Sequence, residues 1–142
     1  MMRLIFSILC LGYWMSVPAF ADTTLGEAVE VEVVVKTRHM WNGQPLPPFT
    51  TGNPEISILR YVIPPGVRLP MHTHDYANAG ILLSGSLTVR DAEGAVKRLQ
   101  PGDALVELIG LPHYGVNEGD EAAVIVVFYA GEAGQPLSAN VE

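Results

Sequence analysis

Residues 66–85 read GVRLPMHTHDYANAGILLSG, and this stretch decides the fold. Within it, His72 and His74 are separated by a single residue. If the segment is extended, both imidazoles project from the same face and lie about 6.5 to 7 Å apart along the backbone. Two imidazoles at that spacing suit two neighbouring ligands of one metal ion. The stretch therefore predicts an extended segment that carries part of a metal site.

The sequence around this stretch is organised as short β-strands. In residues 29–35, valines alternate with Glu30 and Glu32, which is the period-two pattern of a strand with one buried face. Pro- and Gly-containing turn signals separate the later strands at intervals of roughly 8 to 12 residues. The pattern predicts one all-β domain, a sandwich or barrel with its core at about residues 29–130. Further runs with strand character are residues 55–63, 81–84, 87–90, 96–99, 104–108 and 122–129.

Charge and the N-terminal residues limit the classes of partner. Fifteen acidic residues against eight basic ones give a formal net charge of -7, so neither nucleic acid nor an anionic membrane surface is expected as a partner. Residues 1–21 have the features of a secretory signal peptide, with Arg3 before an uncharged run and an A-x-A cleavage pattern at Ala19 and Ala21. We therefore expect an exported domain over residues 22–142, periplasmic or secreted and free of the membrane after cleavage. An uncleaved membrane anchor is the alternative.

A second stretch, residues 102–117, reads GDALVELIGLPHYGVN. His113 follows a Pro-Gly-Asp turn by about ten residues, a distance at which it can arrive from a facing strand. His39 lies far from both stretches and is assigned no role. Gly66, Gly85, Gly102 and Gly110 are interpreted as turn or bulge positions that need unusual backbone angles.

The two stretches together resemble the paired motifs of the cupin superfamily. The first matches G-x5-H-x-H-x3-E-x6-G at every position except Asn78, which stands where the motif has Glu. The second matches G-x5-P-x-G-x2-H-x3-N, with Leu108 in the position of Pro. The resemblance implies a small jelly-roll-like β-barrel after the signal peptide, with a divalent metal ion inside it. It carries over His72, His74 and His113 as ligands of that metal ion.

The fourth ligand is the open question, because an amide such as that of Asn78 can coordinate a hard cation but brings no charge. We expect Asn78 or Glu107 to complete the site. Glu107 lies in an otherwise apolar run, where it can act as a fourth ligand or as the acceptor that orients a ligand imidazole. A solvent-facing Glu107 is the alternative. The metal itself stays open among Fe, Mn, Ni, Zn and Cu, and a metal-free barrel with hydrogen-bonded imidazoles is the competing interpretation.

Two further side chains are candidates for the cavity by strand parity. Tyr76 continues the face of His72 and His74, where it would be a catalytic donor of a proton or hydrogen bond to a substrate. Its alternative is an aromatic ring that caps the core with its hydroxyl in water. Arg60 either projects toward an anionic ligand or extends to solvent. Gly115 and Asn117 continue the face of His113.

Three functions compete on this pattern. The first is a metal-dependent enzyme acting on a small molecule, with dioxygenase-like or isomerase-like chemistry. The second is a non-catalytic module that binds a small ligand or a metal, and the third uses the metal only to stabilise the fold. A homodimer is also expected, because the valine-rich strand over residues 29–35 would otherwise leave an exposed edge. Residues 42–54 are interpreted as an irregular loop and residues 131–142 as a loosely held tail.

Overall fold

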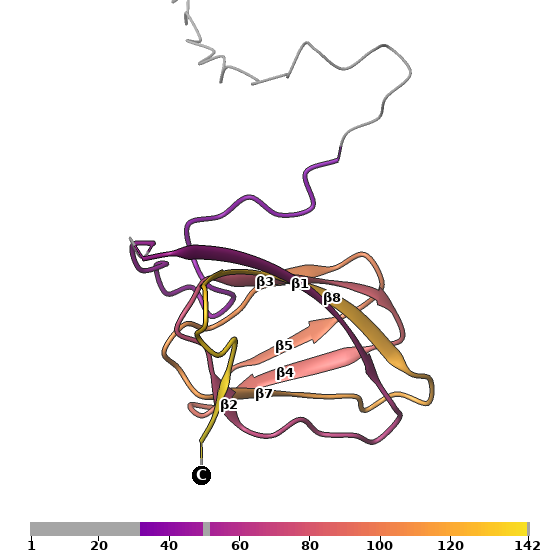
Figure 1. The fold of residues 1–142 in the computed structure, drawn as a ribbon. Helices are drawn as coiled ribbons and strands as arrows, with labels where there is room; N and C mark the ends of the chain where they lie inside the picture. The colour runs from indigo at the N-terminus through magenta and orange to yellow at the C-terminus, as the bar shows by residue number, and fades with distance from the viewer. Residues whose placement is uncertain (1–31, 50–51, 142) are drawn as a thin grey trace, which may run out of the picture. The chain divides into compact units, whose positions relative to one another are not determined.

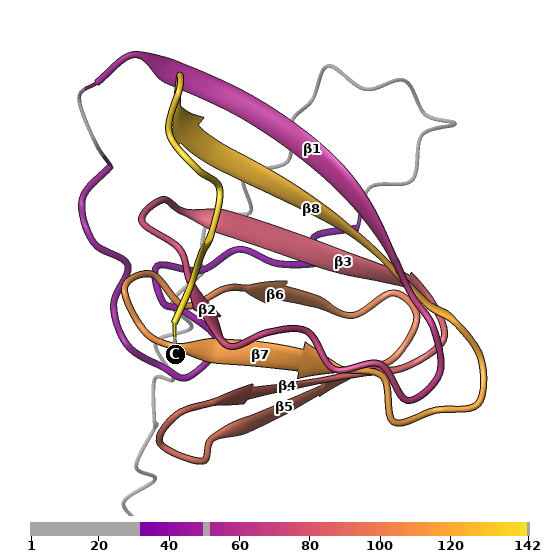
Figure 2. The same cartoon turned by 60° about the horizontal axis from the view of Figure 1, so that its bottom comes forward.

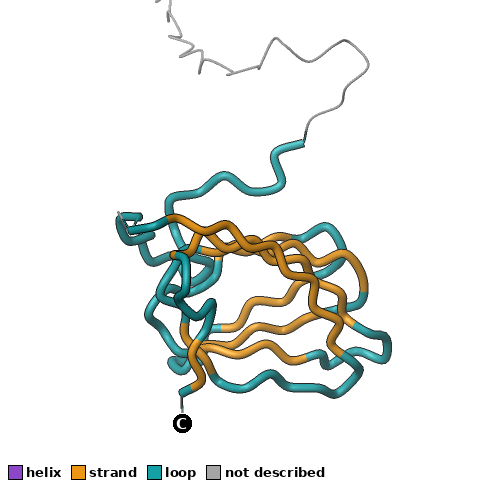
Figure 3. Tube along the Cα trace, in the orientation of Figure 1, coloured by secondary structure: helices purple, strands orange, loops and turns teal. Residues whose placement is uncertain are grey.

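The fold consists of two antiparallel β-sheets that face each other (Figure 1). The computed structural model describes residues 32–49 and 52–141, and this part of the chain contains strands and loops but no helix (Figure 3). One sheet has the strand order β1-β8-β3-β6 and the other has the order β5-β4-β7-β2-β9. The prediction of an all-β, jelly-roll-like barrel is confirmed. The strands are β1 (Pro54–Ile63), β2 (His72–Thr73), β3 (Asn78–Ser84), β4 (Leu87–Asp91), β5 (Val96–Leu99), β6 (Ala104–Val106), β7 (His113–Val116), β8 (Ala123–Glu132) and β9 (Ala139–Asn140).

Apolar side chains from both sheets fill the space between the layers that Figure 2 shows. Strand β8 lies between β1 and β3, and its alternate residues Ala123, Ile125, Val127 and Tyr129 are buried. Each large apolar side chain removed from water in this way contributes about 1.5 to 3 kcal/mol. The other buried members of the core are Ile63, Leu82, Leu87, Val89, Leu99 and Leu105.

Turns at the ends of the strands depend on glycine and on one asparagine. The φ angles of Gly66, Gly85, Gly102 and Gly110 lie between 71° and 92°, which confirms their predicted unusual conformation. Asn117 was expected on the cavity face, but the structure buries it in a turn. Its amide donates to the carbonyls of Ile63 and Glu121 at 2.9 and 2.7 Å, and its oxygen accepts from Gly119 at 2.9 Å. A buried amide satisfied in this way joins the ends of β1, β7 and β8.

Both flanks of the barrel differ from the sequence expectation. Residues 32–35 are not a strand and their side chains are exposed, so the predicted edge strand is wrong over its described part. The remainder of that strand and the predicted signal peptide lie outside the described residues. The expected homodimer stays a prediction. At the other end, residues 131–142 were expected to be loosely held, but residues 131–132 belong to β8 and residues 139–140 form β9, which pairs with β2.

The loop before β1 is anchored by its first residues. Met40 is buried, and its sulfur accepts a hydrogen bond from the amide of Ile109 at 3.1 Å. The amide of Trp41 donates to the carbonyl of Val106 at 3.0 Å. Phe49, in contrast, is 74% exposed. None of the described residues forms a helix long and apolar enough to cross a membrane.

Candidate metal centre

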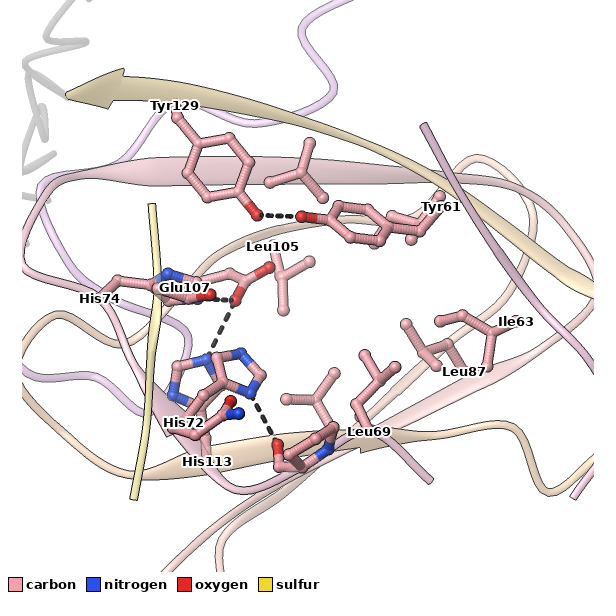
Figure 4. Close-up of a pocket in the computed structure, with 17 residues that line it drawn as sticks. Tyr61, Ile63, Leu69, His72, His74, Leu87, Leu105, Glu107, His113 and Tyr129 are labelled. Carbon is pink, nitrogen blue, oxygen red and sulfur yellow. Dashed lines mark hydrogen bonds and ion pairs between the residues drawn. The ribbon is translucent and has the colours of Figure 1, made fainter. Parts of the chain in front are cut away.

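Four side chains from three strand ends converge inside the barrel. His72 lies in β2 and is the register partner of His113, the first residue of β7. His74 follows β2 and pairs with Ile109, while Glu107 follows β6 directly. One potential ligand atom from each of the four lies within 4.8 Å of the others. The structure therefore brings together the three predicted histidines and Glu107 (Figure 4).

Backbone carbonyls fix the orientation of all three imidazoles. The Nδ1–H groups of His72, His74 and His113 are placed to donate to the carbonyl oxygens of Pro70, Leu137 and Leu111, at 2.8, 2.7 and 2.9 Å. A hydrogen bond at Nδ1 leaves Nε2 as the ring nitrogen available to a metal, and it also sets the direction in which Nε2 points. All three rings are thus oriented by the backbone before any metal arrives.

Glu107 lies between two of the imidazoles. Its Oε2 is 3.0 Å from Nε2 of His74 and 3.0 Å from Nε2 of His113. The side chain is 13% exposed, so the alternative in which Glu107 faces solvent is wrong. Its role as a metal ligand stays a prediction, but the carboxylate is in the position that this role requires.

The ionisation of the cluster follows from this contact. Burial disfavours the charged carboxylate, but hydrogen bonds from His113 and His74 outweigh burial and lower the pKa of Glu107 to about 2. Burial also opposes the charge of His74, yet its hydrogen bond and attraction to Glu107 raise the pKa of that imidazole above its ordinary value. At His72 burial prevails and lowers the pKa.

These shifts predict how the stability of the metal-free protein depends on pH. The low pKa of Glu107 contributes stability above its ordinary value of 4.5, and this is lost as the pH falls toward about 2. The raised pKa of His74 contributes stability below its ordinary value of 6.5, and this is lost as the pH rises through the raised value. In urea unfolding, wild type should therefore exceed Glu107→Gln in stability most between pH 4.5 and 6.5. The difference in stability between wild type and Glu107→Gln should become smaller at alkaline pH, and a difference that becomes larger there would contradict the prediction. Glu93→Gln, at an exposed turn residue, is the control and should change little at any pH.

The side chain of Asn78 makes no hydrogen bond to the side chains of the cluster among the described residues, and its amide donates to the carbonyl of Tyr76 at 3.4 Å. Asn78 pairs in register with Tyr129, and its carbonyl accepts from the amide of Glu107 at 3.1 Å. The Oδ1 atom is buried and has no hydrogen-bond partner among the described residues. Asn78 is also absent from the residues that line the adjacent cavity. Ligation of a metal by Asn78 stays a prediction.

Two other candidates are not in the cavity. The chain bends after β2, so Tyr76 does not continue the face of the histidines, and its hydroxyl donates to Glu132 at 3.1 Å. The prediction of Tyr76 as a catalytic donor in the cavity is wrong for this reason. Arg60 is exposed and shares its face of β1 with Ile58, which is 65% exposed. This face is the outer one, so the guanidinium does not reach a ligand inside the barrel.

A cavity of about 190 Å³ adjoins the four-residue cluster. Most of its wall is apolar, and the sequence pattern does not single out its remaining polar members. Tyr61 and Tyr129 line it next to each other, with their hydroxyl oxygens 3.0 Å apart, and Ser138 and Asn140 line it from the C-terminal segment. The sequence feature that could have indicated the two tyrosines is an aromatic hydroxyl on the inward face of an apolar strand, with Tyr61 on the same face as Ile63 and Tyr129 on the same face as Val127.

The cluster has the dimensions that a metal ion needs. Neighbouring ligand atoms bound at about 2.1 Å to one cation lie about 3.0 to 3.4 Å apart in octahedral or tetrahedral geometry. The two distances of 3.0 Å between imidazole nitrogens and Oε2 of Glu107 match this spacing, and the full set within 4.8 Å needs only small shifts. Three imidazoles and one carboxylate suit a divalent first-row transition metal.

Comparison with known proteins assigns the family. The model of the family described as the cupin domain matches residues 59–129, half of the chain, and the match contains both histidine stretches. The chain belongs to the cupin family. No curated protein matches the sequence.

Solved structures share the cupin fold with this chain. An uncharacterised protein with a double-stranded β-helix domain from Klebsiella pneumoniae has a TM-score of 0.54 at 21% identity, over 66% of this chain and 88% of that one. An oxalate oxidase in complex with the substrate analogue glycolate has a TM-score of 0.53 at 24% identity, over 61% and 46%. The polyketide cyclase RemF from Streptomyces resistomycificus has a TM-score of 0.53 at 20% identity, over 65% and 63%. This chain thus spans less than two thirds of the two enzymes, and at these identities the likeness shows the fold alone.

The candidate site of this cupin has its carboxylate at a different position from the Glu of the family motif. The family motif places Glu in the position of Asn78, in β3, whereas the structure places Glu107 of the neighbouring chain segment among the histidines. The backbones of Asn78 and Glu107 are hydrogen-bonded to each other, so the two side chains start from adjacent points. Glu107 therefore places a negative charge beside the imidazoles although position 78 carries none.

Proposed function

We propose that this cupin is a metal-dependent enzyme that acts on a small organic molecule. In this proposal His72, His74, His113 and Glu107 hold one divalent cation at the end of the cavity. The observation that carries it is the set of three Nδ1 contacts to backbone carbonyls, which orient the rings so that Nε2 of His74 and of His113 lies 3.0 Å from Glu107 and a ring nitrogen of His72 lies within 4.8 Å of the same group. Histidines that merely fill a core do not need a backbone carbonyl to orient each of the three rings.

The protein's own residues prepare the site in three ways. The carbonyls of Pro70, Leu111 and Leu137 orient the rings, Glu107 supplies charge, and the largely apolar cavity wall provides apolar contacts for a ligand beside the cluster. A bound cation with open coordination positions supplies Lewis-acid or redox chemistry. Dioxygenase-like or isomerase-like reactions fit such a site. The named neighbours, an oxidase and a cyclase, indicate that this fold accommodates several small-molecule reactions rather than one.

A non-catalytic binding module is the second candidate, and one observation favours it. Among the residues that line the cavity, the titratable side chains are the four of the cluster and two tyrosines. Burial raises the pKa of Tyr129, and its hydrogen bond with Tyr61 and the charge of Glu107 raise it further, so this hydroxyl is a poor base at neutral pH. A role for the metal in stability alone is less well supported, because a closed structural site needs no cavity beside it.

Metal content and turnover test the proposal together. Purified protein should contain one equivalent of a transition metal per chain by elemental analysis, and His113→Ala should lose it while His39→Ala, at an exposed histidine outside the cluster, should keep it. Metal-dependent O₂ uptake or isomerisation should then be sought with catechols, flavonols and β-diketones. A wild-type protein that binds no transition metal would overturn the proposal. Metal binding without turnover of any substrate would favour the binding module.

A further inference from the structure

The cavity wall is divided into a polar end and an apolar remainder. The cluster of His72, His74, His113 and Glu107 forms the polar end, and Figure 4 shows Ile63, Leu69 and Leu87 on the opposite side. No lysine or arginine is among the residues that line the cavity. A ligand inside it therefore meets cationic charge only at the metal end.

The tyrosine pair is a second polar element of the cavity, separate from the cluster. Tyr61 comes from β1 and Tyr129 from β8, and their hydroxyl oxygens are 3.0 Å apart (Figure 4). Two hydroxyls carry two hydrogens, but the bond between them uses only one. No other acceptor for the second hydrogen is recorded within the described part of the chain. One O–H group is thus free to donate to a molecule in the cavity.

Charge balance limits what that molecule can be. This step rests on the proposed function, because it counts the divalent cation as present. Neutral imidazoles, one carboxylate from Glu107 and one divalent cation leave a single positive charge at the polar end. A ligand with one negative charge is then balanced, whereas a second negative charge would be buried against apolar walls without a partner.

We propose that the cavity binds a small, largely apolar molecule with no more than one negative charge, one oxygen of which accepts a hydrogen bond from the Tyr61–Tyr129 pair. An enol, a phenol or a diketone has this chemistry, and a dicarboxylate does not. The tyrosine pair is a binding element for the substrate oxygen, and the apolar walls select against charge. This assigns a substrate class to the site and a role to two residues outside the metal cluster.

Zinc-loaded full-length protein and two matched probes test the charge argument. Zinc has no redox chemistry, so binding is measured without turnover. The probes are 2,4-pentanedione and malonate, which place two oxygens at the same separation but differ in charge. Titration calorimetry should show the diketone binding at least about tenfold more tightly than malonate, which corresponds to about 1.4 kcal/mol. Malonate binding as tightly as the diketone would overturn the substrate class.

The double variant Tyr61→Phe and Tyr129→Phe tests the hydroxyl pair. Removing both partners of a hydrogen bond while keeping their shape is nearly neutral for folding, so this variant should fold. It should bind 2,4-pentanedione about tenfold more weakly, with zinc affinity unchanged. Tyr114→Phe, at a residue outside the cavity wall, is the control and should bind the probe like wild type. A double variant with wild-type affinity for the diketone would remove the tyrosines from the binding site.

A probe that needs no metal separates this inference from the proposed function. Phenol should bind the metal-free protein about tenfold more tightly than it binds the metal-free double variant, and benzoate should bind more weakly than phenol. If the protein takes up neither zinc nor any other transition metal, the proposed function fails, and phenol still decides whether the tyrosine pair holds a ligand oxygen. If zinc binds but the double variant binds both phenol and the diketone as tightly as wild type does, only the further inference fails.

Discussion

Replacing Glu107 by glutamine is expected to weaken binding of a divalent metal on the order of 100-fold, because the substitution removes the only carboxylate in the four-residue cluster of the described chain. Glutamine has nearly the same shape, so the change isolates the charge. The cation would then sit in a buried site with only neutral ligands, where its charge is poorly compensated. Competition with a chromophoric chelator measures the affinity of wild type and variant. Equal affinities would show that Glu107 is not a ligand and does not orient one.

A companion substitution tests whether a carboxylate at position 78 can replace the carboxylate of Glu107. In the Glu107→Gln background, Asn78→Glu restores the motif of the family, and it should recover at least about tenfold of the lost affinity, since the two positions are hydrogen-bonded neighbours. The single variant Asn78→Ala is the matched control. It should retain wild-type affinity if Glu107 alone completes the site, and it should lose affinity if the amide oxygen of Asn78 is the ligand. Failure of the double variant to recover would show that the two side chains do not reach the same point.

The histidines could be predicted from the sequence because their spacing is local. His72 and His74 need only an extended backbone to share a face, and the register of β2 with β7 then brings His113 opposite His72. The sequence suggested Glu107 as the carboxylate of the site but could not show that its side chain lies among the histidines. Its place depends on how β6 lies against β3, which is a contact between segments far apart in the sequence.

Strand parity alone could not show which face of β1 is buried. Ile56, Ile58 and Val62 share one face of β1 and are apolar as core residues are, yet they are 58%, 65% and 52% exposed. The inward face carries Tyr61 and Ile63 instead. Parity sorts residues into two faces but does not say which one meets the other sheet. For this reason the sequence left open whether Arg60 projects toward a ligand or to solvent, and it did not indicate Tyr61 as a residue of the cavity.

The shortest strands could not be predicted from the sequence pattern either. Strands β2 and β9 have two residues each, too few for an alternation to be recognised. The bend at Asp75 and Tyr76 ends β2 at once, so the parity that placed Tyr76 in the cavity does not persist. The C-terminal segment has no apolar run of its own. Its structure comes from pairing with β2, which itself becomes visible only in the folded chain.

Ending the chain at Gln135 is expected to weaken metal binding about 10- to 100-fold while leaving the two sheets folded. The truncation removes the carbonyl of Leu137, which accepts from Nδ1 of His74 at 2.7 Å, and it removes β9, which pairs only with β2. Without these contacts the imidazole loses the bond that fixes its tautomer, and the cavity loses the wall formed by Ser138 and Asn140. Metal competition and circular dichroism measure the two effects separately.

Two matched chains show whether the backbone of the C-terminal segment is the cause. A chain that ends at Asn140 keeps β9 and the carbonyl of Leu137, so it should bind metal nearly as tightly as the full chain. Leu137→Ala removes the side chain that packs on the core but keeps the same carbonyl, so it should lower stability more than metal affinity. Wild-type affinity in the chain ending at Gln135 would mean that His74 is oriented without this segment. The expected loss, in contrast, would make residues 136–140 part of the metal site, because the carbonyl of Leu137 orients the buried imidazole of His74.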